Sequence, residues 1–396
     1  MTIARRFLPA LPLVALLTAG VARAETKASV DLSAEAGYGS NPFLGVGSNQ
    51  DTGTLSLTAA PAISIQGPTS NVDLTGRVQE NIFTSHYTDT TNWSLGAASV
   101  LKLSPLSSFT LRAGYSSEIY SGIYGSGASP LPPAEGQPLP PTPDPSITET
   151  AGLRTQTLTG NAGFQGTLSP RDTLTLSASA AKLYYPSTLN SDYVNYGGAV
   201  DVDHAFNSKF SGGLGFDYSK TDYDKTGYGS LQNLSPSARA MFKLSPRTTL
   251  NVSAGVTFSQ SSGGLGPSTT ATYFSGNATL CNNGARSNLC VVAARSVGAS
   301  GLAGNSTINS IGGNYSYTLT PRSSFRLSAD YSESHTIGFG TGYDTGYLDA
   351  SAGYQLQFTQ RLSFTASARY TDPFKSPGAR NTSFYGSLGV SYRLGR

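Results

Sequence analysis

Apolar and polar residues alternate along most of this chain. Residues 109–116 place Phe, Leu, Ala and Tyr at odd positions and Thr, Arg, Gly and Ser at even positions. The same alternation runs through 210–219, 325–332 and 362–371. A period of two residues is that of a β-strand, whose successive side chains point to opposite faces. In five such segments the last residue on the apolar face is a tyrosine, where an interfacial aromatic girdle would lie. These residues are Tyr38, Tyr115, Tyr184, Tyr218 and Tyr331.

A short phrase recurs between these segments and predicts tight turns. It reads Leu, Ser or Thr, Pro, and it is followed by a new alternating run. Ser and Thr hydrogen-bond the local backbone, and Pro presets a turn dihedral while removing a ladder donor. Four full copies and three degenerate ones stand at 103–111, 168–176, 244–252, 319–327, 66–71, 206–210 and 358–362. Seven short turns therefore alternate with eight longer connections.

Short turns at one end and long loops at the other are typical of outer-membrane barrels. We predict an all-β fold: a transmembrane antiparallel up-and-down β-barrel of about 16 strands (about 14–18), with both termini periplasmic. Such a barrel would enclose a lumen wide enough for water. A soluble β-sandwich or β-solenoid with similar turns is the alternative.

Residues 1–24 have the pattern of a secretory signal peptide. A basic region at 5–6 precedes an apolar run over 8–17, and a small-x-small cleavage site follows at 22–24. Cleavage there would leave 25–396 as a single outer-membrane β-barrel domain. No later segment has the ~20 apolar residues of a membrane helix.

The charge balance gives no basis for a nucleic-acid partner. The chain has 26 Lys+Arg and 23 Asp+Glu, and loss of Arg5, Arg6 and Arg23 with the signal peptide leaves 23 of each. Charged residues make up 12% of the chain, about half the fraction usual in soluble domains. This composition favours strands that face lipid on one side and water on the other.

If the apolar positions face lipid, the polar positions line a lumen. Acidic and basic residues are nearly balanced on that predicted inner face. Rings of one sign select ions, so a balanced wall predicts weak ion selectivity or a lumen cross-linked by its own salt bridges. Simple solvation of a wet face explains the same residues. The candidate lumen-lining residues are Arg77, Lys102, Arg112, Asp201, Asp217, Arg239, Arg326, Asp330 and Arg369.

Two long connections stand out. Residues 121–152 are rich in proline, which favours extended or disordered backbone. This loop either folds inward and narrows the pore, contacts polymer outside, or is only a surface loop. Residues 261–304 form a longer predicted loop that holds Cys281 and Cys290. In an exported chain, so close a pair predicts a disulfide that staples the loop. Without a third Cys or a nearby His, the pair makes a poor zinc site.

Three histidines are the candidates for catalysis. Some outer-membrane barrels are hydrolases with Ser or Asp and His on their outer rim. His86 with Asp89, or His335 with Ser334 and Glu333, could serve that chemistry, and His204 lies beside a predicted turn. No nucleophile motif flanks these residues. We therefore expect no enzyme, no catalytic residue, and no cofactor or metal.

The last strand carries an ordered pattern of small, aromatic and hydrophobic residues. Gly389, Tyr392 and Leu394 resemble the C-terminal signal by which outer-membrane barrels are handed to the barrel-assembly machinery. That machinery is thus an implied partner. Gly395 and Arg396 follow the hydrophobic residue at which such signals usually end.

The segment 32–43, Leu-Ser-Ala-Glu-Ala-Gly-Tyr-Gly-Ser-Asn-Pro-Phe, resembles the opening of the β-barrel porin-2 (BBP2-like) outer-membrane family. That family typically has Gly-Tyr-Asp-Ser-Asn-Pro-Phe here, so Gly39 replaces its Asp. The Leu-Ser-Pro-Arg turns and the Gly-Val-Ser-Tyr-Arg-Leu ending are also similar. The resemblance implies a barrel in the outer membrane of a Gram-negative bacterium, associated with exopolysaccharide systems.

These observations together favour a porin-like barrel that forms an aqueous channel in outer-membrane lipid. The resemblance adds assistance to exopolysaccharide export, with extracellular polysaccharide or an export complex as partner. The alternative is a non-conducting outer-membrane scaffold or surface-binding barrel plugged by its long loops. An outer-membrane hydrolase is the third hypothesis.

Overall fold

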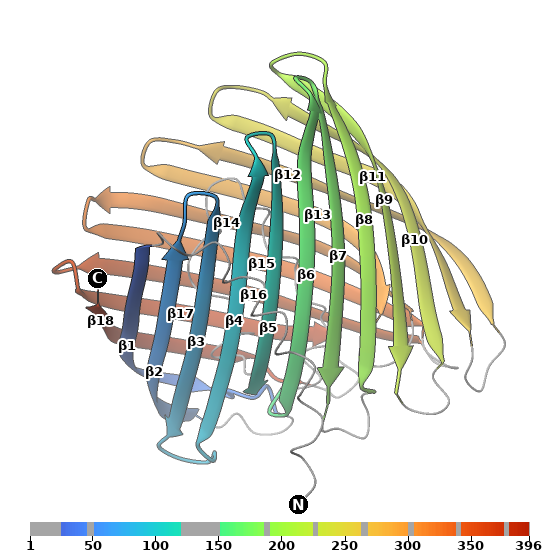
Figure 1. The fold of residues 1–396 in the computed structure, drawn as a ribbon. Helices are drawn as coiled ribbons and strands as arrows, with labels where there is room; N and C mark the ends of the chain where they lie inside the picture. Colours follow the sequence, from blue (N-terminus) through green and yellow to red (C-terminus); the bar gives the residue numbers. More distant parts are fainter. Residues whose placement is uncertain are drawn as a thin grey trace, which may run out of the picture.

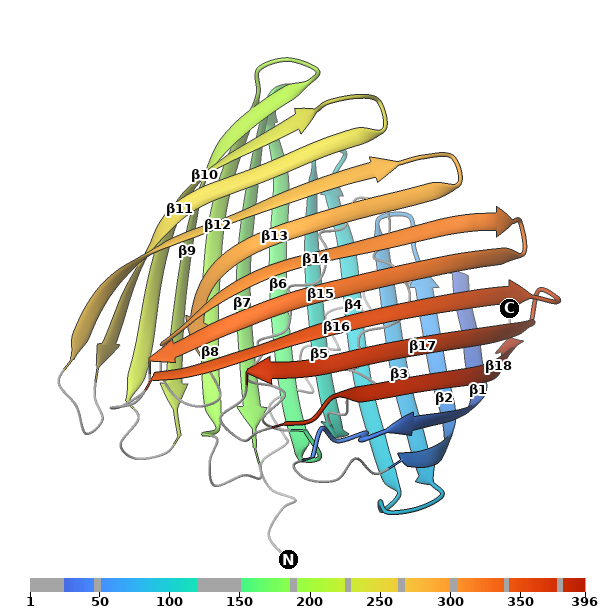
Figure 2. The ribbon, with the colours of Figure 1, turned by 180° about the vertical axis from the view of Figure 1, so that it is seen from behind.

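The described strands form one closed antiparallel barrel of 18 strands (Figures 1 and 2). The computed structural model describes residues 25–45, 51–119, 151–185, 191–224, 229–262, 268–299, 305–337, 342–375 and 380–395. Each strand pairs with its neighbours in sequence, and β1 pairs with β18 as well as β2, which closes the sheet. Within these residues, no helix is long and apolar enough to cross a membrane.

The strands follow the chain in order. They are β1 (Glu25–Ser40), β2 (Asp51–Gln66), β3 (Ser70–Phe83), β4 (Thr90–Ser104), β5 (Ser107–Ile119), β6 (Arg154–Ser169), β7 (Asp172–Tyr184), β8 (Tyr193–Ala205), β9 (Phe210–Tyr223), β10 (Ser230–Lys243), β11 (Thr248–Ser262), β12 (Thr269–Asn283), β13 (Ser287–Ala299), β14 (Asn305–Thr320), β15 (Ser323–Ile337), β16 (Gly342–Gln357), β17 (Leu362–Lys375) and β18 (Ser383–Gly395).

Apolar side chains lie on the outside of the barrel. On β9, Leu214, Phe216 and Tyr218 are exposed on the outer face, whereas Ser219 and Thr221 face inward. The fully buried side chains are mostly Ser, Thr and Asn on the inner face. This distribution is the reverse of that in a soluble protein, where apolar side chains fill the core. The prediction of an all-β barrel is confirmed, and the soluble sandwich is excluded.

All seven predicted short turns connect neighbouring strands at one end of the barrel. The Ser or Thr of the recurring phrase caps each full copy, since its hydroxyl accepts a hydrogen bond from the amide two residues on. These bonds join Leu106 to Ser104, Arg171 to Ser169, Arg247 to Ser245 and Arg322 to Thr320, at 3.1–3.2 Å. The repeat thus supplies a hydrogen-bond acceptor for a backbone amide in each of these tight turns.

The predicted count of about 16 strands is two short, and the difference lies in 261–304. This segment is not a long loop, because β12 and β13 occupy most of it and a short turn at 284–286 joins them. That turn has no Pro, so it lacks the recurring phrase. The continuous apolar run at 291–294 and an outward-facing Arg295 also hide the two-residue period.

Cys281 and Cys290 form a disulfide with an S–S distance of 2.06 Å. They are directly paired across β12 and β13, on the inner face. The disulfide therefore joins two strands beside the short turn, and the prediction that it staples a loop over 261–304 is wrong. The disulfide lies between strands because β12 and β13, which the sequence pattern did not predict, occupy the segment that was expected to be a loop.

Two other predicted segments fall mostly outside the described residues. These are the signal peptide, 1–24, and all of 121–152 except Ala151 and Gly152. The start of β1 and the end of β18 lie together at the short-turn end, where Ser29 pairs with Gly395. Which side of a membrane this end faces stays a prediction.

Candidate functional site: the inner wall of the barrel

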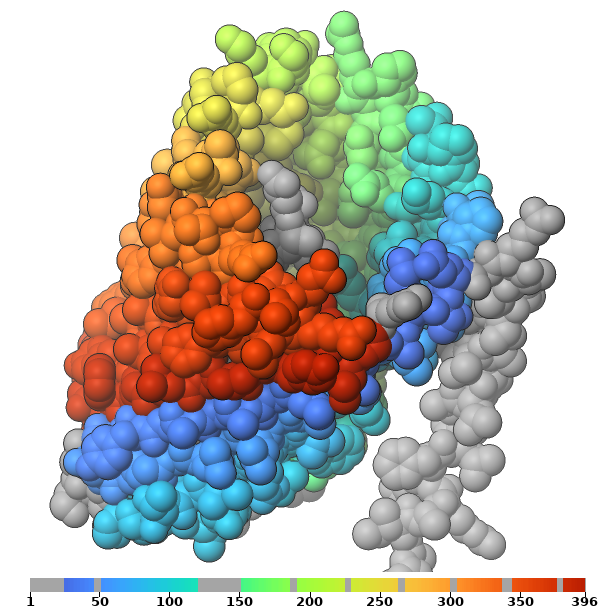
Figure 3. Space-filling view, turned by 90° about the vertical axis from the view of Figure 1, so that its left-hand side faces the viewer, coloured from blue at the N-terminus to red at the C-terminus, as the bar shows by residue number. Residues whose placement is uncertain are grey.

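The inner wall encloses a hollow. Viewed from the left-hand side of Figure 1, the surface is hollowed between the wall coloured cyan to green and the wall coloured yellow to red (Figure 3). Alternation along each strand directs one residue in two into this space. Eighteen strands give a barrel of the size that encloses an aqueous channel in porins.

Charged side chains occupy only some sectors of this wall. All nine candidate lumen-lining residues are at inward positions, on β3–β5, β8–β10 and β15–β17. By contrast, the inward positions of the described strands β6, β7 and β11–β14 carry no Asp, Glu, Lys or Arg. They carry mainly Ser, Thr, Asn and small residues. The wall therefore alternates between charged and neutral sectors.

Three arginines form four ion pairs that neutralise much of the inner-wall charge. Arg239 lies 2.5 Å from Asp201 and 3.7 Å from Asp203, which joins β10 to β8. Arg369 Nε donates to Asp349 at 2.8 Å, and Arg393 binds Asp31 through two bonds of 2.7 and 2.9 Å. Bidentate and charge-assisted bonds of this kind fix geometry as well as charge. The predicted cross-linking of the lumen by its own salt bridges is present in these sectors.

Other inward charges have no such partner in the described part of the chain. Lys102, Arg112 and Asp217 are exposed, and neither an ion pair nor a side-chain hydrogen bond joins them to another described residue. They stand on β4, β5 and β9. These three side chains are among the charges that a solute in the lumen would meet directly.

A polar network covers the inner face of β2 and β3. Arg77 Nη2 donates to Gln79 Oε1 at 2.7 Å, and Gln79 Nε2 donates to Asn81 Oδ1 at 2.9 Å. Ser56 Oγ donates to the same Asn81 oxygen at 2.9 Å, and Asn81 Nδ2 donates to Thr90 Oγ1 at 3.2 Å. Buried polar groups that satisfy one another in this way hold a rigid wall.

A packed cluster that the sequence pattern did not predict lies at the long-loop end. Leu44 is fully buried and packs with Ala151. Phe43 packs against Phe83 and Tyr87, with ring centroids 5.6 and 5.3 Å apart. Burial raises the pKa of the Tyr87 phenol, and the nearby Asp51 carboxylate adds to the rise.

Asn41 fastens this cluster to the last connection of the barrel. Its Nδ2 donates to the carbonyl oxygens of Asn381 and Thr382 at 3.2 and 3.4 Å, and its Oδ1 accepts from the Gly45 amide at 2.7 Å. The backbone of Asn41 has φ +46°, a conformation that Asn tolerates better than most residues. The Asn-Pro-Phe motif at 41–43 was the available signal, because it marks a special turn.

The barrel wall divides one of the predicted catalytic groupings, that of His335 with Ser334. His335 faces outward and its Nδ1 lies 2.6 Å from Asp344 Oδ1, whereas Ser334 faces inward from the same strand. His86 lies in the connection after β3 with φ +66°. His204 faces outward and pairs with Asp172 at 2.7 Å. In the described residues, no cluster of three or more His, Cys, Asp or Glu could hold a metal ion.

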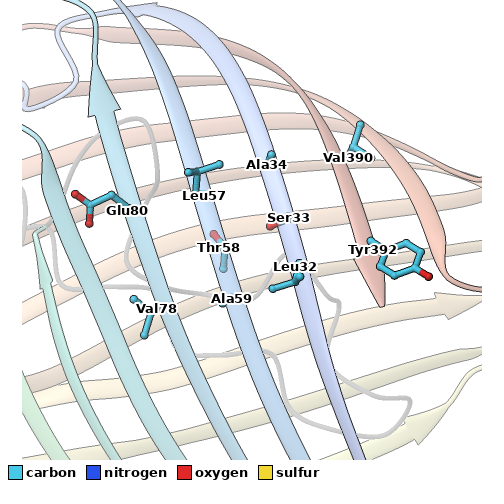
Figure 4. Close-up of a pocket in the computed structure, with 10 residues that line it drawn as sticks. All are labelled: Leu32, Ser33, Ala34, Leu57, Thr58, Ala59, Val78, Glu80, Val390 and Tyr392. Atoms are coloured by element: carbon cyan, nitrogen blue, oxygen red, sulfur yellow. The ribbon is translucent and has the colours of Figure 1, made fainter. Parts of the chain in front are cut away.

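The outer wall carries a groove of about 540 Å³ at the closing seam (Figure 4). It runs over β18, β1, β2 and β3, and its lining is apolar apart from a few groups that include Glu80. Glu80 accepts a hydrogen bond of 2.5 Å from Thr91 Oγ1. The lining residues are Leu32, Ser33, Ala34, Leu57, Thr58, Ala59, Val78, Glu80, Val390 and Tyr392.

No protein-family model and no curated protein sequence matches the chain, so the resemblance to the β-barrel porin-2 family has no support there. Solved barrels do resemble it. OccK2 (OpdF) of Pseudomonas aeruginosa is 12% identical, with TM-score 0.48, 94% of this chain and 98% of that one covered. The outer membrane protein OpdK of the same organism is 13% identical, with TM-score 0.47 and 93% and 99% covered.

The siderophore receptor PirA from Acinetobacter baumannii is 8% identical, with TM-score 0.47, and the match covers 93% of this chain and 80% of that one. Identities this low, with TM-scores under 0.5, say nothing about function. The fold of this chain is established by its strand pairing alone.

Proposed function

We infer that this chain is a porin-like barrel of a Gram-negative outer membrane that forms an aqueous channel. The observation that carries this function is the contrast between the two faces of a closed 18-stranded barrel. Its outer face exposes Leu, Phe, Val and Tyr, and its inner face presents hydroxyl, amide and charged groups. Only a closed barrel satisfies every strand's backbone in lipid, because it leaves no open sheet edge.

The arrangement of the ends supports an orientation with the short turns and both strand termini in the periplasm. Outer-membrane barrels have short periplasmic turns and longer extracellular loops. The outer face near the long connections carries charged groups beside aromatic ones. For example, Glu333 forms an ion pair with Lys375 and accepts a hydrogen bond from the Tyr331 hydroxyl. Such groups fit the interface between hydrocarbon and water.

Single-channel recording from the folded chain in a planar bilayer tests this function. Stable current steps in the nanosiemens range are expected from a water-filled barrel of this size. Migration on gels should also change on boiling, because a closed barrel resists detergent until heated. A folded, heat-modifiable barrel that never conducts would contradict the channel.

A plugged scaffold is the second candidate, and one observation favours it. Inward side chains near the long-loop end, including Ser334, Thr336 and Thr371, are fully buried, and the cluster around Leu44 packs there as well. The inner wall is therefore covered by neighbouring atoms at this end. Current recordings separate the two candidates, since a plugged barrel would fold normally and stay silent.

Export of exopolysaccharide, with extracellular polysaccharide or an export complex as partner, rests on the sequence resemblance alone. Gly389 faces inward on β18, and Tyr392 and Leu394 face outward, so a strand carries the proposed assembly signal. Recognition by the barrel-assembly machinery follows from that signal as a proposal. The separation of His335 from Ser334 removes one of the two groupings that supported a hydrolase.

A further inference from the structure

Three inward cations follow strand β4 at equal steps. Lys102 is on β4 itself, Arg112 of β5 pairs with Ala98 of β4, and Arg77 of β3 pairs with Ser94 of β4. The three levels on β4 are therefore 102, 98 and 94. Four residues of strand rise span ~13 Å, so the cations form a column that climbs the wall over ~26 Å.

The column keeps a surplus of positive charge. Asp73 lies in the same cross-strand row as Arg112, and its carboxylate keeps its negative charge while it accepts a hydrogen bond from Asn71 at 2.9 Å. Glu118 lies near enough to Arg77 for their charges to interact. Three cations therefore stand against two carboxylates on the inner faces of β3, β4 and β5, which leaves one positive charge in excess. Lys102 and Arg112 have no ion-pair or hydrogen-bond partner among the described residues. Both are exposed to the lumen.

On the side of β6, a neutral stretch of wall separates this column from the acidic sector. The next two strands, β6 and β7, have only uncharged residues at their described inward positions. Beyond them, inward carboxylates appear again on β8 and β9, where Asp201 and Asp203 share Arg239 and Asp217 has no ion pair with another described residue. At ~4.8 Å per strand, the two regions are separated by ~15–20 Å of neutral wall.

We propose that Lys102, Arg112 and Arg77 form an anion track along β4, which makes anionic solutes the preferred substrates of the channel. This inference rests on the proposed channel function and names the residues that set its preference. At ~0.01 M salt the Debye length is ~30 Å, longer than the ~13 Å steps, so the three fields merge. At ~1 M it falls to ~3 Å and each charge acts alone.

Reversal potentials across a KCl gradient test the track, with the full folded chain in a planar bilayer. The wild type should prefer chloride over potassium at low salt. Lys102→Gln with Arg112→Gln should lower the chloride-to-potassium permeability ratio several-fold, and the difference should vanish near ~1 M KCl. Asp217→Asn should shift the ratio in the opposite direction. Arg112→Lys should retain the preference.

The matched control is Arg295→Gln, which removes one arginine from the outer wall, where Arg295 Nη1 bonds Asn309. Its ratio should equal that of the wild type. A conducting double variant with the wild-type reversal potential would overturn the track and leave the channel intact. A folded wild type that carries no current would overturn both the anion track and the channel function. Heat-modifiable migration on gels shows that each variant has folded.

Discussion

The phenol oxygen of Tyr385 on β18 lies 2.9 Å from Thr54 Oγ1 on β2, although β1 runs between the two strands. The tyrosine side chain crosses the inner face of β1 above Gly37 and Gly39. A Cβ on Gly37 would lie 2.2 Å from that phenol oxygen. The Tyr385 ring thus covers the closing seam of the barrel, and it fits there because Gly37 has no side chain.

Replacement of Gly37 by valine should weaken this seam. The new side chain would occupy the position of the Tyr385 ring, and overpacking of this kind costs about 1–3 kcal/mol. The temperature at which the folded form converts to the unfolded form on gels should fall. Tyr385→Phe removes only the hydroxyl contact and should cost about 1 kcal/mol.

Gly386→Ala is the control for Gly37→Val, because a Cβ there meets nothing within 4 Å. It should leave the conversion temperature unchanged. Equal conversion temperatures for Gly37→Val and the wild type would show that the ring does not depend on the glycine.

The cluster at the long-loop end should loosen when Asn41 becomes alanine. The variant loses the bonds to Asn381, Thr382 and Gly45, and alanine disfavours the positive φ of this position. Hydrogen exchange should accelerate at residues 41–45 and 380–382.

Asn41→Asp is the informative comparison, since the carboxylate can still accept from the Gly45 amide but cannot donate to the two carbonyl groups. Exchange should then accelerate mainly at 380–382. Unchanged exchange in both variants would mean that the packing of Leu44 and Phe43 alone holds the cluster.

The sequence was sufficient where two-residue alternation and a repeated turn coincided. It predicted the barrel, seven turns and the inward placement of Arg112 and Asp217, because these depend on side-chain period alone. It missed β12 and β13, where the turn at 284–286 has no Pro and Arg295 points outward. Which charges are paired could not be predicted, since Arg239 meets Asp201 only through the register of three strands.

Gly39 is a second residue whose role could not be predicted from the sequence. In the sequence it stands only as a glycine where the β-barrel porin-2 family typically has Asp. In the barrel, a Cβ at this position would lie 2.5 Å from the Phe384 carbonyl oxygen and 2.9 Å from the Tyr385 ring. The reason for the glycine lies on a strand more than 300 residues away in sequence, which no local pattern reveals.

Removal of Arg239 should unbalance the acidic sector. Arg239→Gln leaves Asp201 and Asp203 without their shared cation, close to Asp217, and like charges at short range destabilise one another. The free energy of unfolding should fall by about 1 kcal/mol, and the effect is small because these side chains remain partly hydrated. The chloride-to-potassium permeability ratio should fall at low salt.

Arg239→Lys provides the comparison, because it keeps the charge but cannot span both carboxylates as a planar guanidinium does. Ion preference should then stay near that of the wild type while stability falls. A chloride-to-potassium permeability ratio that does not fall in Arg239→Gln would show that this sector lies off the conducting path.

Loss of the disulfide should destabilise the β12–β13 hairpin without changing the channel. In the chain-entropy view, a crosslink over so short a loop stabilises by about 2–3 kcal/mol, and less where the strands are already paired. Cys281→Ser with Cys290→Ser should therefore lower the temperature of conversion on gels, and the wild type treated with reductant should match it. Conductance should be unchanged, because the pair lies beside the short turn, away from the cation column on β4. Altered ion preference in the double variant would contradict this separation and place β12 and β13 on the solute path.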